Sequence, residues 1–378
     1  MKDGWDIKKL GEVCFITMGQ SPNSESYNKL GDGLPFFQGC SDFGAIHPLV
    51  TTWCNQPNKI ANPNDILMSV RAPIGTLNIA DSKCCIGRGL AAFTQKEGVT
   101  INKFLYYFLL SSKGDLQSKG TGATFKAIGK ELIKNYAIKL PSLSEQQHIV
   151  EELDLLSSII EKKKAQLNEL DNLAQSLFYE MFGDNADCST KKIKDIAIVK
   201  IGPFGSSLHK SDYVSGGTPL INPIHMSEGK ILPDENFTIT NEKKKELETY
   251  LLQTNDIIFG RRGDIGRCAL VTRKENGYLC GTGSLFVRFQ VNINPIYCIN
   301  YLSTRFVKDY LVQNAKGATM LNLNSKIIEN VPMLFPSLDL QNQFASKIEA
   351  IERQKELIKQ SIKEVETLFN SRMDYYFN

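Results

Sequence analysis

Apolar residues recur with heptad spacing in two long segments of the chain, residues 143–183 and 339–378. Each segment has two rows, and each row is apolar at all but at most one position. In the first segment, one row is formed by Ile149, Leu156, Lys163, Leu170 and Leu177, and the other by Leu153, Ile160, Leu167, Ala174 and Met181. In the second segment, one row is formed by Phe344, Ile351, Ile358, Val365 and Arg372, and the other by Ile348, Lys355, Ile362, Phe369 and Tyr376. Such rows form the seam of a coiled coil, so the pattern predicts two long helices that pair with each other or with a partner.

These two segments are copies of one another. Residues 122–183 align without a gap with residues 317–378, at an offset of 195 positions. Each helix follows a proline, which stops a helix from running in from upstream. Ser144 and Asp339 are expected to cap the two helices. The chain is therefore predicted to consist of two similar halves, each ending in a long helix.

The segments that precede the helices, residues 1–142 and 184–338, show strand-like runs between glycine-rich turns. Their clearest correspondence sets residues 64–75 against residues 255–266. Both stretches begin with Asn-Asp-Ile, end with Ile-Gly and carry an arginine at the same position. Between such landmarks the two segments share little sequence. We therefore expect an α+β protein with two mixed α/β domains on one scaffold, whose binding surfaces differ.

Charge divides along the same boundaries. Residues 1–142 carry 16 Lys and Arg against 11 Asp and Glu, and residues 184–338 carry 19 against 15. The first helical segment has 3 against 8, and the second has 6 against 7. Two basic globules thus alternate with acidic helices. A basic globule attracts polyanions such as nucleic acid, whereas an acidic helix suits a protein partner.

The overall composition limits the cellular setting. The 378 residues are 42% hydrophobic, and the most apolar window, residues 104–110, is too short to span a bilayer. The first residues lack the apolar run of a signal peptide, so we expect a cytoplasmic protein without a membrane partner. The nine cysteines include no Cys-x-x-C pair, which indicates reduced thiols and neither a disulfide framework nor a zinc site.

Candidate DNA-binding residues lie on turns and loops of the two globules. A guanidinium on a turn after a strand can reach a guanine edge or a phosphate, and lysine, amide and hydroxyl groups on loops suit contacts to the backbone or to base edges. The alternatives are an arginine that pairs with a local carboxylate, such as Asp65 or Asp264, and ordinary polar loops. The candidates are Gln20, Ser21, Arg71, Arg88, Lys126, Lys130, Ser206, Ser207, Arg261, Arg262, Arg267, Asn322 and Asn324.

Signatures of catalysis are weak throughout the sequence. The Asn222-Pro223-Ile224 tripeptide is only faintly similar to the Asn-Pro-Pro-aromatic loop of adenine methyltransferases, and Asn222 aligns with Gln38 of the first globule. The glycine turns at residues 87–89 and 281–283 lack the third glycine of a dinucleotide or S-adenosylmethionine loop. The four histidines have no metal-ligand spacing. We predict no catalytic residue, no cofactor and no metal. A stand-alone methyltransferase or restriction enzyme and a coiled-coil scaffold stay as alternatives.

The junction at residues 140–149, Leu-Pro-Ser-Leu-Ser-Glu-Gln-Gln-His-Ile, stands between a basic globule and a heptad helix. This arrangement, twice in one chain, resembles the DNA-specificity subunit of Type I restriction-modification systems. The second junction departs from the pattern, since Leu340 stands where the first has a glutamate. The resemblance covers nearly the whole chain.

Several expectations follow from this resemblance. It implies target recognition domains at residues 1–142 and 184–338, and spacer helices at residues 143–183 and 339–378 that pair as an antiparallel coiled coil. Each domain would read one half of a split site in double-stranded DNA. Two methyltransferase (modification) subunits and the restriction subunits would supply catalysis, so the chain itself is not an enzyme. The helices would bind the modification subunits through apolar residues outside the seam, namely Ile159, Leu173, Phe178 and Leu368.

Overall fold

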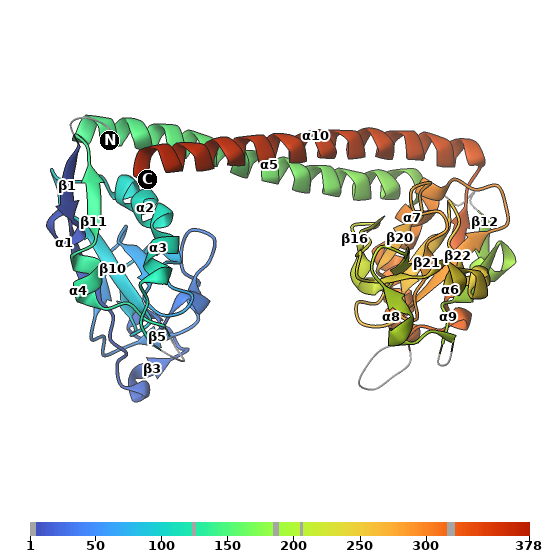
Figure 1. The fold of residues 1–378 in the computed structure, drawn as a ribbon, viewed down its shortest axis with the longest axis horizontal. Coiled ribbons are helices and arrows are strands. Elements are labelled where there is room, and N and C mark those ends of the chain that lie inside the picture. Colours follow the sequence, from blue (N-terminus) through green and yellow to red (C-terminus); the bar gives the residue numbers. More distant parts are fainter. Residues whose placement is uncertain (1–4, 123–125, 184–188, 205–206, 316–321) are drawn as a thin grey trace. The chain divides into compact units, whose positions relative to one another are not determined.

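The computed structural model describes residues 5–122, 126–183, 189–204, 207–315 and 322–378. It divides into two compact units, which we call the first unit (residues 1–164 and 360–378) and the second unit (residues 165–359). Each unit combines one globule with the adjoining parts of two 40-residue helices, α5 (Leu143–Phe182) and α10 (Leu338–Phe377) (Figure 1). Within the described ranges, no helix is long and apolar enough to cross a membrane.

Both long helices begin earlier than their expected caps. The backbone N–H of Glu145 donates to Ser142 Oγ at 3.3 Å, and that of Leu340 donates to Ser337 Oγ at 3.3 Å. Ser142 and Ser337 occupy equivalent positions of the repeat and satisfy backbone donors of the first turn. The prediction that Ser144 and Asp339 cap these helices is therefore wrong, because both residues lie inside the first turn.

The two helices pair in antiparallel fashion within the first unit. The Arg372 guanidinium lies 2.7 Å from Glu152, and the Lys164 ammonium lies 3.1 Å from Glu366. Residue numbers thus rise along α5 while they fall along α10. The expectation of a mixed α/β fold with an antiparallel helix pair is confirmed.

The second unit continues this pairing around a lysine of the apolar seam. The Lys355 ammonium on α10 contacts Asp171 on α5 at 2.7 Å and Glu352 on its own helix at 2.8 Å. Burial alone would lower the pKa of Lys355, but these two hydrogen bonds outweigh it and the pKa is raised. Because its charge is matched across the seam, this lysine fixes the register of the two helices at this point.

Three sheets form the globule of the first unit. Strands β1 and β11 pair with each other, a second sheet has the order β2-β10-β7-β8, and a third has the order β3-β5-β4-β9-β6. Within the third sheet, β4 and β9 run parallel and the other neighbours run antiparallel. The element bounds are β1 Asp6–Lys9, α1 Leu10–Val13, β2 Cys14–Met18, β3 Tyr27–Asn28, β4 Leu34–Phe37, β5 Trp53–Cys54, β6 Ile60–Ala61, β7 Ile66–Ser69, β8 Leu77–Ile79, β9 Cys84–Ile86, β10 Leu90–Gln95, α2 Asn102–Ser111, α3 Lys113–Ser118, α4 Lys130–Lys134 and β11 Ala137–Leu140.

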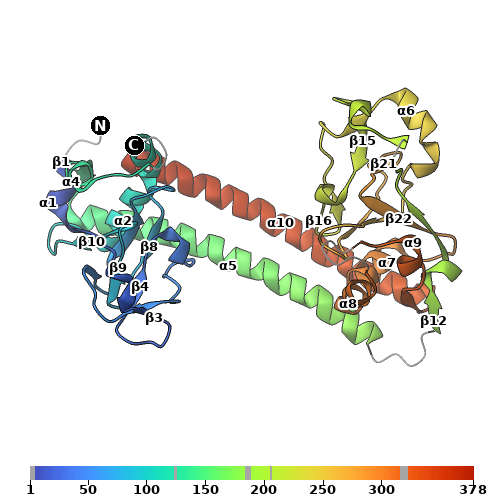
Figure 2. The ribbon, with the colours of Figure 1, turned by 90° about the horizontal axis from the view of Figure 1, so that it is seen from below.

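The second unit repeats this plan. Strands β12 and β23 pair with each other, the order β13-β22-β19-β20 matches the second sheet of the first unit, and β14-β18-β15-β21 again contains one parallel pair, β15 with β21. Figure 2 shows β15 and β21 on the opposite side of β22 from α7 and α9. The bounds are β12 Ser189–Lys192, β13 Ala197–Ile201, β14 Tyr213–Val214, β15 Thr218–Ile221, β16 Met226–Ser227, β17 Lys230–Ile231, β18 Thr238–Ile239, α6 Asn241–Glu246, β19 Ile257–Gly260, β20 Cys268–Leu270, β21 Leu279–Cys280, β22 Ser284–Phe289, α7 Pro295–Leu302, α8 Arg305–Asn314, α9 Ser325–Glu329 and β23 Pro332–Phe335.

The repeated Asn-Asp-Ile sequence builds the same turn in both units. Asn64 and Asn255 have φ angles of 70° and 74°, a left-handed conformation that asparagine tolerates better than most residues. The next residue in each case is a buried aspartate, Asp65 or Asp256. Each aspartate accepts a hydrogen bond of 2.7 Å from a backbone N–H three residues upstream. The repeated Asn-Asp-Ile sequence is thus explained by the turn through which the chain enters β7 in the first unit and β19 in the second.

Buried glutamines fasten each long helix to its globule. Gln146 is fully buried, and its Oε1 accepts from the Ile101 N–H at 2.9 Å while its Nε2 donates to the Pro141 carbonyl at 3.0 Å. Gln341, at the equivalent position, accepts from the Asn294 N–H at 2.9 Å and donates to the Pro336 carbonyl at 2.9 Å. The glutamine of each junction therefore links the first turn of the long helix by hydrogen bonds to the backbone of the preceding segments of its globule.

Replacing Gln146 with leucine should lower the free energy of unfolding by about 2–3 kcal/mol, because backbone groups of Pro141 and Ile101 lose their partner inside the core. Chemical denaturation followed by circular dichroism measures this change. Gln147, the next residue, is exposed, so Gln147→Leu is a matched control that should stay within about 0.5 kcal/mol of wild type. Equal effects of the two substitutions would contradict the role of Gln146.

The cysteines of the described ranges are free, and all but Cys40 are buried. Burial raises the pKa of the Cys14 and Cys84 thiols to about 12. Both are therefore protonated at neutral pH and behave as small apolar core residues.

Candidate nucleic-acid interface

Arg71 and Arg262 occupy the same place in the two units. Each follows a strand, β7 or β19, and its backbone forms an isolated bridge to a later loop, Arg71 with Ala127 and Arg262 with Asn322. Both arginine side chains are exposed. Lys126 adds a second exposed cation beside Arg71, since its carbonyl accepts from the Ala72 N–H at 3.1 Å. The structure thus brings two exposed cations together, Arg71 on the loop after β7 and Lys126 on the loop before α4. A guanidinium in such a position can meet phosphate or a guanine edge.

Arg261 differs from its neighbour because its side chain is buried, with 5% of its surface exposed. Its Nε donates to the Leu323 carbonyl at 3.0 Å, and its guanidinium also donates to Asn322 Oδ1 at 3.3 Å and covers the Phe204 ring at 4.7 Å. Burial, and secondarily the Arg262 charge, lowers the pKa of Arg261. The structure therefore places Arg261 and Asn322 in a clamp between two loops.

Arg267 and Asn324 also make contacts within the protein. The Arg267 guanidinium pairs with Asp264 at 3.2 Å and donates to the Pro223 carbonyl at 3.1 Å. Arg267 therefore makes the ion pair with a local carboxylate, Asp264, that the sequence offered as the alternative to a DNA contact. Asn324 Oδ1 accepts from the Ile327 N–H at 3.0 Å and so caps α9.

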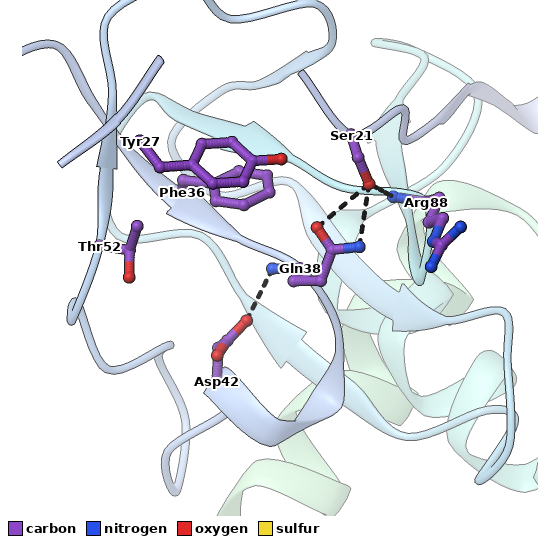
Figure 3. Close-up of a pocket in the computed structure, with 7 residues that line it drawn as sticks. All are labelled: Ser21, Tyr27, Phe36, Gln38, Asp42, Thr52 and Arg88. Carbon is purple, nitrogen blue, oxygen red and sulfur yellow. Dashed lines mark hydrogen bonds between the residues drawn. The ribbon is translucent and has the colours of Figure 1, made fainter. Parts of the chain in front are cut away.

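A cavity of about 410 Å³ opens in the first unit beside the turn that carries Arg88 (Figure 3). Its lining residues are Ser21, Tyr27, Phe36, Gln38, Asp42, Thr52 and Arg88. The Gln38 amide pairs with the Ser21 hydroxyl, with Nε2 2.9 Å from Oγ, and the Tyr27 and Phe36 rings stack at 4.6 Å. The cavity thus combines hydrogen-bonding groups, one exposed arginine and an aromatic wall, a combination that suits a nucleobase.

The remaining candidates come from separate segments of the chain. Gln20 is exposed just before Ser21, Ser207 is half-buried, and Lys130 is the exposed first residue of α4. Ser206 lies outside the described residues. Sequence reasoning missed Gln38 as a site residue, although the alignment of Gln38 with Asn222 was a usable signal, and it missed Tyr27 and Phe36, for which the sequence offers no signal.

Comparison with known proteins decides the family. The type I restriction modification DNA specificity domain matches residues 2–172 and again residues 185–367. The chain belongs to this family. The two matched regions also correspond to the two halves of the internal repeat.

Proteins with sequences similar to this specificity-domain chain are named specificity subunits of type I restriction enzymes. The putative type I restriction enzyme MjaX specificity subunit of Methanocaldococcus jannaschii is 40% identical over 177 residues, which cover 46% of this chain and 42% of that protein. The MjaIX specificity subunit of the same organism is 23% identical, over 92% of this chain and 86% of that protein. The crystal structure of the type I restriction-modification system S subunit from M. genitalium shares the fold, with 16% identity, a TM-score of 0.58 and coverage of 100% of this chain and 97% of that one.

The long helices of the specificity-domain chain expose some of the apolar residues that lie outside the seam. Leu173 is 50% exposed, Leu368 is 48% exposed, and Ile159 is half-buried. Phe178, by contrast, is 7% exposed and packs against Tyr297 and Phe344 in the core of the second unit. The structure therefore places Phe178 in the core instead of on a docking surface. Leu155 and Leu357, at 62% and 67%, are more exposed candidates that the sequence pattern did not single out.

Proposed function

We propose that this protein is the DNA-specificity subunit of a type I restriction-modification complex and that it recognises a bipartite site in double-stranded DNA. Residues 1–142 and 184–338 act as target recognition domains, each reading one half of the site. The observation that carries this proposal is the repeated scaffold, which presents an exposed arginine, Arg71 or Arg262, at the same loop of each unit. A duplicated fold with divergent loops suits two different half-sites.

The catalytic steps belong to other subunits of such a complex. Two methyltransferase (modification) subunits supply methylation, and the restriction subunits supply cleavage. The exposed apolar residues of α5 and α10, among them Leu155, Leu173 and Leu368, are the surface on which the modification subunits dock. Exposed apolar side chains suit a protein partner, and the net negative charge of residues 143–183 would repel DNA. We infer that the complex works in the cytoplasm, where the host DNA is found.

Replacing Arg262 with alanine should relax recognition of one half-site and leave the other half intact, because a bidentate contact between arginine and a base contributes about 1–3 kcal/mol of discrimination. The measurement is methylation of a library of split sites by the complex reconstituted with its modification subunits. Arg305 on α8 is a matched control, since its side chain is 88% exposed and pairs only with Asp309, at 3.6 Å, among the described ion pairs. Arg305→Ala should keep the wild-type motif. A loss at both half-sites with Arg262→Ala would contradict the assignment of one half-site to each unit.

A further inference from the structure

In both units, an amide side chain at the end of a short strand lies against a Gly-x-Gly turn. Gln38 follows β4 in the first unit, and the turn at residues 87–89 follows β9. Asn222 follows β15 in the second unit, and the turn at residues 281–283 follows β21. Both strand pairs are parallel neighbours, so their carboxyl ends share one edge and bring the amide and the turn together.

The first of these amides is held on three sides. The Gln38 backbone N–H donates to Asp42 Oδ2 at 2.6 Å, and the side-chain Nε2 donates to Ser21 Oγ at 2.9 Å. A Cβ atom on Gly87 would lie 2.5 Å from Gln38 Oε1. The side-chain amide therefore occupies the space that only a glycine leaves open, and its position at the cavity is fixed before any ligand arrives.

The second amide is held in a similar way by different residues. The Asn222 backbone N–H donates to His225 Nδ1 at 3.2 Å, and Asn222 Oδ1 accepts from the Gly283 N–H at 3.1 Å. A Cβ atom on Gly281 would lie 2.3 Å from Asn222 Oδ1. Different contacts in the two units thus hold a side-chain amide at the equivalent position beside the Gly-x-Gly turn. This indicates that the position of the amide matters for the function of the site.

What differs between the two sites is the group that each presents. Gln38 is one methylene longer than Asn222, and the residue between the glycines is Arg88 in one turn and Thr282 in the other. The Arg88 backbone N–H donates to Ser21 Oγ at 3.3 Å, while its side chain stays exposed at the cavity (Figure 3). A constant scaffold with exchanged polar groups is the arrangement expected of a site that reads different bases.

We propose that Gln38 with Arg88, and Asn222 with Thr282, determine which bases the two half-sites contain. This inference rests on the proposed function and names the residues that read the DNA. An amide can pair bidentately with adenine N6 and N7, and an arginine with guanine O6 and N7, whereas a threonine hydroxyl is far less selective. The first unit therefore reads a guanine through Arg88, and the second unit discriminates less at the equivalent base pair.

The deciding experiment replaces Arg88 with threonine, the residue of the other unit. The complex reconstituted with its modification subunits methylates a library of split sites, and methylation is scored at every position. Preference for guanine at one position of one half-site should fall on the order of 10- to 100-fold, and the other half-site should be unchanged. Asn222→Ala should relax one position of the other half-site only.

Lys83→Thr is the matched control, because Lys83 is an exposed cation just before β9 and its replacement removes the same charge. This variant should keep the wild-type motif. If Arg88→Thr weakens binding to all sequences alike and lowers the salt dependence by about one phosphate contact, Arg88 binds the backbone and the inference is overturned. A wild-type complex that methylates no split site would refute the proposed function itself. A wild-type split motif that Arg88→Thr leaves unchanged would refute only the present inference.

Discussion

Replacing Phe377 with alanine should destabilise the first unit by about 3–5 kcal/mol, the range for removing a buried aromatic ring from a packed core. Phe377 lies on the last turn of α10, yet its ring is 8% exposed and packs 5.4 Å from Phe104 and 6.2 Å from Phe108 of α2. Met373 and Tyr376 belong to the same buried cluster. The final turns of the described chain therefore complete a core that is otherwise built from the first globule.

Peptide-resolved hydrogen exchange on the full chain measures this effect where it is expected. Amides of α2 and β10 should lose protection, while amides of β19 and β22 in the second unit should keep theirs, because they belong to a separate core. Tyr375→Ala is the matched control, since Tyr375 is 60% exposed on the same turn. The control should change protection little. Uniform loss of protection in both units would show that Phe377 does not act through the first core.

The long helices were predictable from the sequence because their signal is periodic and repeated. Heptad rows run over residues 149–181 and again over residues 344–376. The observed helices, Leu143–Phe182 and Leu338–Phe377, begin and end within one residue of the predicted segments. The caps were mispredicted because Ser142 and Ser144 are both good capping residues, and only the backbone of the preceding strand decides between them. Gln146 recurs as Gln341 at the 195-residue offset of the repeat. Its role, however, depends on carbonyl and N–H groups of other segments, which no local pattern encodes.

The candidate interface could be predicted only in part. The repeat placed Arg71 and Arg262 at equivalent loops, and the structure leaves both side chains exposed. The sequence did not distinguish the adjacent Arg261 from Arg262. In the structure, however, the Arg261 side chain turns into the protein and donates to the Leu323 carbonyl and to Asn322 Oδ1. Phe178 likewise lay outside the heptad seam, and a globule covers it in the fold. Side chains that meet only through tertiary packing cannot be told apart by spacing along one element.

Lengthening both long helices by one turn should shift methylation to split sites with a longer gap and abolish it at the native gap. Both α5 and α10 run without interruption across the division between the two units, at residues 164–165 and 359–360. We propose that they act as a spacer between the half-sites. Four added residues lengthen a helix by about 6 Å and rotate it by about 40° beyond a full turn. One base pair adds about 3.4 Å and about 35°, so the preferred gap should grow by one or two base pairs.

The insertions have to be matched because the helices are paired. Lys164 contacts Glu366 on one side of the insertion point, and Asp171 contacts Lys355 on the other. Four helix-forming residues after Gln166 and four after Gln360 keep the partners of each ion pair at the same height along the two helices, whereas an insertion in α5 alone shifts one set of partners relative to the other. The unmatched variant should therefore lose methylation at every gap. Replacing four residues at each point with alanine, without changing the length, is the control and should keep the native gap. If the matched insertion also keeps the native gap, the helices do not set the distance between the half-sites.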